Sequence, residues 1–313
     1  MAGTYDGVLL VAFGGPASRE EVRPFLDRVL KGAAVPAERI EEVVRHYEAV
    51  GGRSPLNEIT FRQARALGEA LAARGRSLPV HVGLRNARPF LAEALREMAR
   101  AGVSRALGVV LSAHHSEASW DRYHETVADA RAELGDAAPR VDFCGGWHDH
   151  PLFVETWSEQ IRDCLASCPE GESREIPLVF TAHSIPMAMA RRSPYVEQIR
   201  RSASLIAERL GRHGWTLAYQ SRSGHPAEPW LEPDIRQVVR ELAARGFSRA
   251  VAAPIGFVAD HVEVLYDLDI EAKKIAAACG LELLRAPCPN DRPLFIEMLA
   301  DVVSRSLSAS AVP

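Results

Sequence analysis

Short runs of apolar and β-branched residues alternate with longer helical patterns along all 313 residues of the chain. Apolar runs of about four to eight residues are typical of buried strands, and strands that alternate with helices build a parallel sheet covered by helices. We therefore predict an α/β fold. Strands are expected near residues 7–13, 79–84, 105–112 and 140–145, and then near 177–183, 215–220, 249–256 and 281–285. Helices are expected at about 18–31, 36–50, 58–75, 89–101, 117–134, 151–168, 194–213, 231–245, 260–279 and 292–309.

The two halves of the chain have similar patterns. EMARAGVSRA at 97–106 matches ELAARGFSRA at 241–250 at its Glu, Ala, Gly, Ser, Arg and Ala positions. The first strand of each half ends in Ala-x-x-x-Pro, so Phe13 and His183 occupy equivalent strand ends. Any two βαβ units can share such an alternation of strands and helices, but the sequence matches favour duplication of one structural unit. We place the boundary near Gly145–Gly146, which gives domains at 1–145 and 146–313.

Composition excludes several classes of protein. Apolar residues make up 47% of the chain and charged residues 25%, as in ordinary globular proteins, so disordered and fibrous classes are excluded. The net charge is −4 with both signs interspersed, which argues against nucleic acid as a partner. The opening MAGTYDGVLLVAFGGP has no basic leader, and its apolar run is too short to span a membrane. Five cysteines do not resemble a disulfide framework, so we expect a cytoplasmic protein.

Several polar residues follow the ends of expected strands, where ligands bind in open α/β sheets. They are Arg85, His114, His115, His183, Gln220, Asp260 and His261. Two such domains that face each other enclose a cleft. The chain contains neither G-x-G-x-x-G nor G-x-x-x-x-G-K-[ST], which argues against a dinucleotide or a phosphoryl-transfer site.

His183 could accept a proton or bind a metal through a neutral nitrogen, and a purely structural role is the alternative. The sequence has no G-x-S-x-G motif or reactive-cysteine context, so covalent catalysis is not indicated. Cys144, Cys164 and Cys168 are near one another in sequence. Because no C-x-x-C pair exists, a zinc or iron–sulfur site has only weak support.

Carboxylates recur at four-residue spacing in GFVADHVEVLYDLDIE at 256–271. Glu263, Asp267 and Glu271 should form one stripe on an α-helix, because four residues complete slightly more than one turn. The opposite, apolar face is expected to contain Leu265, Leu268, Ala272, Ile275, Ala276 and Cys279. The acids could face a partner or a site. Alternatively, Asp260 and Glu263 form a capping box and the stripe is a solvated face.

Long segments of the chain resemble the signature segments of the ferrochelatase family. These are TAHSIP at 181–186, PWLEPDI at 229–235 and GFVADHVEVLYDLDIE at 256–271. Upstream, LLVAFGGP at 9–16, HYEAVGGRSPLN at 46–57 and GLRNARPF at 83–90 fall in the corresponding order. The resemblance implies two Rossmann-like domains, each with a four-stranded parallel sheet, and a porphyrin-binding cleft between them. It also implies an enzyme that inserts Fe²⁺ into a porphyrin, with release of two protons, in haem biosynthesis.

The resemblance implies roles for individual residues. His183 matches the family's essential histidine and Glu263 the carboxylate that works with it, so these two are the expected catalytic and metal-contacting residues. Asp267 and Glu271 match an acidic path that leads to them. Phe13 matches the position on the opposite side of the macrocycle. Asp260, His261 and Trp230 match further active-site positions.

The propionate partners are less clear from the sequence. Lys31, Arg53, Ser54 and Arg85 are candidates by position, with surface solubility as the competing explanation for the cations. Some relatives have adjacent arginines where this chain has Leu30 and Lys31. The chain ends at Pro313 without the cysteine-bearing extension of the cluster-containing animal type. We therefore expect no iron–sulfur cluster, no tightly bound cofactor and no integral membrane segment, with Fe²⁺ as a substrate and a monomer as the simplest state.

Two alternative functions stay open. One is a related chelatase that inserts cobalt or nickel into a sirohydrochlorin-type ring; such enzymes place the catalytic histidine near the first strand's end, where this chain has Phe13. The other is a tetrapyrrole or metal carrier without catalysis, which does not need His183 and Glu263 together. The sequence does not distinguish coproporphyrin III from protoporphyrin IX as the substrate.

Overall fold

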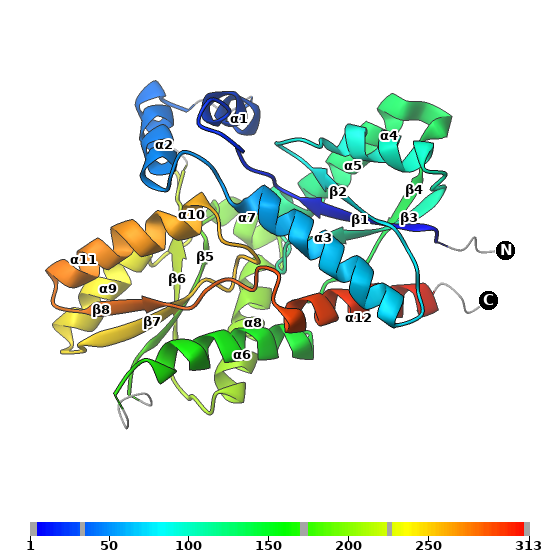
Figure 1. Cartoon of the computed structure of the whole chain (residues 1–313). Coiled ribbons are helices and arrows are strands. Elements are labelled where there is room, and N and C mark those ends of the chain that lie inside the picture. Colours follow the sequence, from blue (N-terminus) through cyan, green and yellow to red (C-terminus); the bar gives the residue numbers. More distant parts are fainter. Residues whose placement is uncertain (1–4, 32–34, 170–174, 224–226, 310–313) are drawn as a thin grey trace.

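The strands of the computed structural model form two four-stranded parallel sheets, one in each half of the chain (Figure 1). The model describes residues 5–31, 35–169, 175–223 and 227–309. The strand orders are β2-β1-β3-β4 and β6-β5-β7-β8, so the two sheets are built on the same plan. The strands are β1 Gly7–Ala12, β2 Val80–Leu84, β3 Arg105–Val110, β4 Arg140–Phe143, β5 Leu178–His183, β6 Thr216–Gln220, β7 Arg249–Ala253 and β8 Glu282–Arg285. The predicted α/β class is confirmed.

The central strands are buried on both faces, which explains their continuous apolar sequences. In β1, GVLLVA pairs with β2 on one side and β3 on the other, and all six residues are buried. A parallel strand covered by helices on both faces has no solvated side, so it lacks polar alternation. The edge strand β4, RVDF, alternates exposed and half-buried residues. Central strands were therefore the easiest elements to recognise in the sequence.

Helices cover both faces of each sheet (Figure 1). In the first sheet, α3 and α12 cover one face and α4 and α5 cover the other. In the second sheet, α6 and α8 cover one face and α9 and α11 cover the other. The helices of the first half are α1 Val22–Val29, α2 Ala37–Ala49, α3 Leu56–Ala73, α4 Leu91–Arg100, the π-helical turn η1 Glu117–Asp121, α5 Arg122–Leu134 and the 3₁₀ turn η2 Gly135–Ala137. Those of the second half are α6 Pro151–Ala166, α7 Met187–Arg192, α8 Tyr195–Arg209, α9 Ile235–Ala244, α10 Val262–Leu265, the π-helical turn η3 Asp267–Ala272, α11 Lys273–Ala278 and α12 Pro293–Ala309.

The last helix crosses from the second half to the first. In Figure 1, α12 lies below α3, and the two helices are in contact. Arg74, just after α3, donates to the backbone carbonyl of Glu297 at 3.2 Å. α12 also contacts α6, so it joins the two halves. The domain boundary at 145/146 stays a prediction, and α12 belongs structurally to both sides of it.

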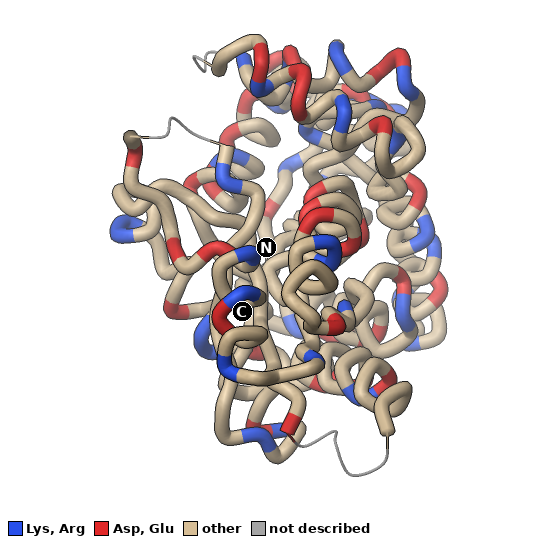
Figure 2. Tube along the Cα trace, turned by 90° about the vertical axis from the view of Figure 1, so that its left-hand side faces the viewer, with Lys and Arg blue, Asp and Glu red and all other residues tan. Residues whose placement is uncertain are grey.

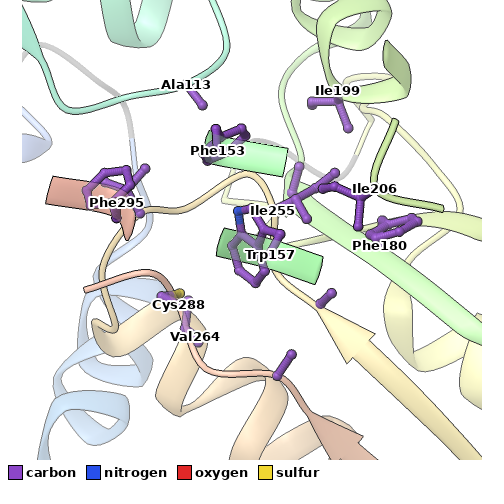
Figure 3. Close-up of a cluster of buried hydrophobic side chains, with 14 of the residues drawn as sticks. Ala113, Phe153, Trp157, Phe180, Ile199, Ile206, Ile255, Val264, Cys288 and Phe295 are labelled. Atoms are coloured by element: carbon purple, nitrogen blue, oxygen red, sulfur yellow. The ribbon is translucent and has the colours of Figure 1, made fainter. Parts of the chain in front are cut away.

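One large hydrophobic core extends through both halves. It includes Leu10 of β1, Phe295 of α12 and Phe180 of β5, each with no exposed surface. Figure 3 shows its central part, where Phe153 and Trp157 of α6 lie among side chains from several other elements. Such continuous burial holds the carboxyl ends of both sheets in a fixed relation.

Two local features differ from the sequence prediction. The short helix α7, directly after Ile185-Pro186, was not predicted. The helix expected over 260–279 is interrupted by η3, where the backbone N–H of Glu271 donates to the carbonyl of Tyr266, five residues earlier, at 2.9 Å. A π-helical turn contains more residues than an α-helical turn, so the buried face differs from the one expected for a regular α-helix. Val264 is fully buried in place of Leu265, and Cys279 is exposed.

Residues of both charge signs are distributed over the trace (Figure 2). This distribution agrees with the interspersed pattern of the sequence. No helix in the described ranges is both long enough and apolar enough to cross a membrane.

Candidate active site

The carboxyl ends of the second sheet bring several candidate residues together. His183 is the last residue of β5, and Gln220, the last of β6, is its register partner. The segment after β7 leads through Asp260 and His261 to Glu263 in α10. Because parallel strands end at the same edge, residues far apart in sequence meet here.

Glu263 lies between two histidines. Its Oε1 is 3.4 Å from His183 Nε2, and its Oε2 is 3.4 Å from His261 Nε2. The three side chains are 35%, 29% and 15% exposed, in the order Glu263, His183, His261, so solvent and small ligands reach them. His183 Nδ1 contacts the carbonyl of Ser184. A proton on Nδ1 makes that contact a hydrogen bond and leaves Nε2 of a neutral His183 free to accept a proton or a metal.

The His183–Glu263 pair favours the charged form of both partners. Burial by itself lowers the pKa of His183, but the negative charge of Glu263 and the hydrogen bond to it outweigh burial and raise the pKa. Burial by itself raises the pKa of Glu263, but the charges and hydrogen bonds of His183 and His261 hold it well below its usual range. Without a ligand, the site is therefore an ion pair near neutral pH.

Three buried tyrosines interact electrostatically with Glu263. Burial and then the charge of Glu263 raise the pKa of Tyr47. Burial also raises the pKa values of Tyr123 and Tyr195, with the Glu263 charge contributing to both. The Tyr195 hydroxyl donates to the His183 carbonyl at 3.0 Å. These neutral hydroxyls were not recognised in the sequence, because nothing in an isolated tyrosine signals proximity to a distant carboxylate.

The acidic stripe exists, and η3 keeps it aligned. A step of four residues turns through slightly more than one full turn in an α-helix and slightly less than one in a π-helix. The sideways drifts of the stripe in the two segments are therefore in opposite directions and partly cancel. Besides burial, the charges of Glu263 and Glu271 raise the pKa of Asp267. Burial is the largest cause that raises the pKa of Asp267 to about 7, while a hydrogen bond from Ser221 lowers it. The stripe therefore includes one carboxyl that can exchange protons near neutral pH.

Glu271, at the far end of the acidic stripe, and Asp260, which precedes the stripe, have different partners. Glu271 Oε1 is 3.4 Å from Arg236 Nη1, near the surface. Asp260 pairs with Arg285 at 2.8 Å and accepts from Asn290 Nδ2 at 2.7 Å. His261 occupies the N-cap position of α10 and makes no side-chain cap bond. The capping box considered for Asp260 and Glu263 is therefore absent from this helix.

An apolar and aromatic surface comes from the first half. Phe13 follows β1, and its ring meets Phe25 edge-on at 6.1 Å between centroids, while Phe25 meets Tyr47 in the same way at 6.1 Å. These residues pack against Val262 of α10 in one hydrophobic cluster. The cluster places Phe13 and the residues before Glu263 on adjoining surfaces of the two halves.

Arg85 is a half-buried cation at the end of β2. Burial is the largest cause that lowers the pKa of its guanidinium, and an electrostatic interaction with Tyr123 partly opposes it. Within the described part of the chain, the Arg85 side chain has no hydrogen-bond or ion-pair partner. A desolvated, unpaired cation is costly, so this position suits an anionic ligand.

The other candidate ligand-binding residues differ in their surroundings. Arg53 pairs with Glu58 at 2.9 Å on the surface, and Lys31 is exposed. Ser54 is 5% exposed, and its hydroxyl accepts from the Leu56 backbone at 3.3 Å. Trp230 is partly exposed, and its indole N–H donates to Glu228 at 3.1 Å. The structure therefore brings His183, Glu263, His261 and Asp267 into one network, but none of these contacts connects that network to Lys31, Arg53 or Ser54.

The other polar strand-end residues have structural partners. His114 is 1% exposed, and its Nε2 contacts Ser202 Oγ of α8 at 3.0 Å, while the His115 ring lies against Trp120. All five cysteines are free thiols. Over the described ranges, no group of three His, Cys, Asp or Glu side chains is arranged as a metal site. The three-residue cluster at Glu263 thus offers partial coordination rather than a closed cage.

Comparison with protein families and known sequences gives a consistent result. A family model described as Ferrochelatase matches residues 5–307. The coproporphyrin III ferrochelatase of Mycolicibacterium smegmatis is 40% identical over 307 residues, which cover 97% of this chain and 90% of that protein. The ferrochelatase of Rhodopirellula baltica is 40% identical over 304 residues, covering 97% of this chain and 86% of the relative.

Similar solved structures share the fold at low sequence identity. SirB from Bacillus subtilis with Fe³⁺ has a TM-score of 0.59 and 11% identity, with 97% of this chain and 96% of that chain covered. DR2241 from Deinococcus radiodurans, described as similar to chelatases, has a TM-score of 0.52 and 19% identity, with 98% and 56% covered. At these identities the likeness concerns the fold alone.

Proposed function

The chain belongs to the ferrochelatase family, and we propose that the porphyrin into which it inserts Fe²⁺, in haem biosynthesis, is coproporphyrin III. The observation that carries the reaction is the Glu263 carboxylate held between His183 and His261, at 3.4 Å from each. The choice of porphyrin is supported by the relative from Mycolicibacterium smegmatis, which is a coproporphyrin III ferrochelatase.

The spacing of His183 and Glu263 suits brief metal binding. Two ligands about 2.1 Å from one first-row divalent metal, at a tetrahedral angle, lie about 3.4 Å apart, and the Nε2–Oε1 distance is 3.4 Å. Fe²⁺ replaces the proton on His183 Nε2, because both need the same lone pair. An imidazole and a carboxylate, without thiolates, bind iron weakly enough to release it to the macrocycle.

The same residues supply the acid–base chemistry. Porphyrin and Fe²⁺ give iron porphyrin and two protons, so both pyrrole N–H protons must leave. As iron leaves His183 Nε2 for the ring nitrogens, this nitrogen is free to accept one of the two protons, and the negative charge of Glu263 stabilises the resulting imidazolium. The second proton leaves through ionised Asp267 or directly to solvent. Asp267, with a pKa of about 7, can pass protons towards Glu271 and solvent. We assign His183 and Glu263 catalytic roles, and Asp267 and Glu271 the roles of proton and metal path.

The macrocycle is proposed to lie between Phe13 of the first half and His183 of the second. Trp230 and His261 contribute further contacts, and Arg85 binds a propionate. Coproporphyrin III carries four propionates where protoporphyrin IX has two propionates and two vinyl groups, so it gains more from cations around the site. Lys31, Arg53 and Ser54 stay predicted contacts, and for Arg53 the bond to Glu58 must first break.

Steady-state kinetics with both porphyrins tests the choice of substrate. We expect kcat/KM to be at least about tenfold higher for coproporphyrin III than for protoporphyrin IX, at matched aggregation state and under anaerobic conditions with Fe²⁺. Arg85→Leu should raise the KM for coproporphyrin III, whereas Arg88→Leu should not, because Arg88 is exposed and paired with Glu93. A preference for protoporphyrin IX contradicts the proposal.

The related-chelatase alternative has less support, because Phe13 stands at the first strand's end and the structural likeness to SirB concerns the fold only. Competition between Fe²⁺ and Co²⁺ over porphyrin and sirohydrochlorin separates the two. We further propose a monomer in the cytoplasm with no resident cofactor or cluster; the five free thiols fit a reducing compartment.

A further inference from the structure

The connection between β8 and α12 is the route by which the chain passes from the second sheet back to the first half. Two fully buried glutamine amides hold it. Gln160 of α6 donates to the carbonyl of Cys288 at 3.0 Å, and Gln63 of α3 donates to the carbonyl of Asn290 at 2.7 Å. In Figure 3, Cys288 and Val264 of α10 lie near each other in the buried cluster. The connection therefore packs beneath the helix that begins the acidic stripe.

Asn290 has a strained backbone. Its φ is 49°, and only one other non-glycine residue in the described ranges, Ser221, has a positive φ. The left-handed region is unfavourable for an L-residue, and asparagine adopts it more readily than most residues. Strain of this kind persists where surrounding contacts determine the conformation.

Those contacts enclose the segment that leads to the catalytic residues. The Asn290 backbone N–H donates to the Val258 carbonyl at 2.9 Å. Its side-chain Oδ1 accepts from the Asp260 backbone N–H at 2.9 Å, and its Nδ2 donates to Asp260 Oδ2 at 2.7 Å. Asp260 Oδ1 is bonded to Arg285 at 2.8 Å, so both carboxylate oxygens have structural partners. Asp260 is therefore held in place and not available as a free ligand.

One residue thus connects α3 of the first half to the catalytic segment of the second. The path runs from Gln63 through the Asn290 carbonyl, and from the Asn290 amide to Asp260. His261 is the next residue, and it contacts Glu263. We propose that Asn290 is a positioning residue for metal insertion: it fixes Asp260, and with it His261 and Glu263, relative to the first half. This inference rests on the proposed function, because the residues that it positions are those assigned to the reaction.

The chemistry of the contact requires an asparagine amide. Aspartate at this position keeps an acceptor for the Asp260 N–H but loses the Nδ2 donor and brings two carboxylates together. Glycine tolerates the positive φ and keeps the backbone bonds, but loses both side-chain bonds. Asn290→Gly therefore separates positioning from backbone strain.

Two variants and one control test the proposal with the full-length enzyme. Asn290→Gly should lower kcat by about 10- to 100-fold, because a displacement near 1 Å at a catalytic group has an effect of that size. The Kd for the porphyrin should stay within about twofold. Gln63→Met, which keeps the side-chain length but removes the donor, should lower kcat in the same direction. Asp291→Asn should not, because its ion pair with Arg62 lies on the surface.

The outcomes distinguish a positioning role from a structural one. Circular dichroism and thermal melting define the temperature at which each variant is folded, and kinetics are measured below it. Loss of kcat with unchanged porphyrin Kd supports positioning. If folded Asn290→Gly keeps kcat within about twofold of the wild type, the proposal is wrong; if that variant does not fold, Gln63→Met decides by the same criterion. Assays of the wild-type enzyme with both porphyrins test the proposed substrate separately. The variants are then compared with the wild type on the porphyrin that the wild-type enzyme prefers.

Discussion

His183 Nε2 and Glu263 Oε1 lie 3.4 Å apart, although β5 and α10, which carry them, are separated by about eighty residues of chain. The pair is close enough for strong electrostatic coupling and longer than an ordinary hydrogen bond of about 2.7–3.2 Å. The pair can shorten to share a proton, and its present spacing already matches that of two ligands on one divalent metal ion.

Neutralising Glu263 should lower the pKa of His183. Burial alone lowers that pKa, and the charge and hydrogen bond of Glu263 raise it above the ordinary value. In Glu263→Gln the raising influences are lost and burial remains, so we expect a fall of about one unit or more. NMR titration of the His183 ring measures it. An unchanged pKa contradicts the coupling described for the site.

Wild-type affinity for Fe²⁺ should rise with pH through the raised pKa of His183. The metal needs the neutral Nε2, and the proton stays bound until the pH approaches that pKa. The measurement is the Kd of Fe²⁺ or a redox-stable divalent substitute as a function of pH. In Glu263→Gln the midpoint should move to lower pH, together with weaker binding from the lost carboxylate. A pH-independent Kd in the wild type argues against His183 as a ligand.

The acidic stripe should have graded effects. Asp267 is half-buried and its pKa is raised to about 7, so Asp267→Asn should lower kcat/KM for Fe²⁺ by about tenfold. Glu271 is nearer the surface and pairs with Arg236, so Glu271→Gln should lower it by about threefold. Glu282→Gln, at the start of β8, is the control and should have no effect. Total loss of activity at both Asp267 and Glu271 conflicts with a path that only delivers metal or removes protons.

Gly256 should not tolerate a side chain. A Cβ at this position lies 2.6 Å from the Cβ of Ala182 and 2.7 Å from its Cα, next to His183. Gly256→Ala should therefore destabilise the protein by about 1–3 kcal/mol and lower kcat, because the backbone of β5 must move. Gly214→Ala, where a Cβ meets nothing within 4 Å, is the matched control. Chemical denaturation and kinetics give both quantities; equal stability of the two variants refutes the close approach.

Acid should destabilise the fold through His114. Burial lowers its folded-state pKa from 6.5 to about 3. Between these values the unfolded chain binds a proton that the folded protein does not, so the free energy of unfolding falls as pH falls below 6.5. One such group contributes about 1 kcal/mol per pH unit near pH 5. His114→Gln should have a shallower dependence between pH 6 and 4 by about that amount. Identical slopes contradict the assignment.

Much of the fold could be predicted from the sequence because its strands are buried on both faces. Continuous apolar runs such as LLVA in β1 have one interpretation, and all eight strands were expected within a few residues of their bounds. α7 was missed because a helix of six residues after a proline gives little periodic signal. The π-helical turn was also missed, since its hydrogen bonds depend on backbone geometry that side-chain periodicity does not specify.

The candidate site was predicted in part. His183 and Asp260 to Glu263 follow strand ends, and the parallel topology brings strand ends together. The tyrosines around Glu263 come from three different helices, and their convergence depends on tertiary packing. Arg53, a propionate candidate by position, pairs in the structure with Glu58, five residues later, and its contact with a propionate stays a prediction. Local ion pairs of this kind compete with any role assigned from position alone.

Metallation by His183→Ala and Glu263→Gln, measured beside porphyrin binding, tests the account most directly. Insertion of Fe²⁺ into coproporphyrin III is followed anaerobically by absorbance, and binding by fluorescence quenching of the porphyrin. The account predicts that both variants lose metallation by at least about a thousandfold while their porphyrin Kd stays within a few-fold of the wild type. Metallation at the wild-type rate by both variants contradicts the central role given to the His183–Glu263 pair.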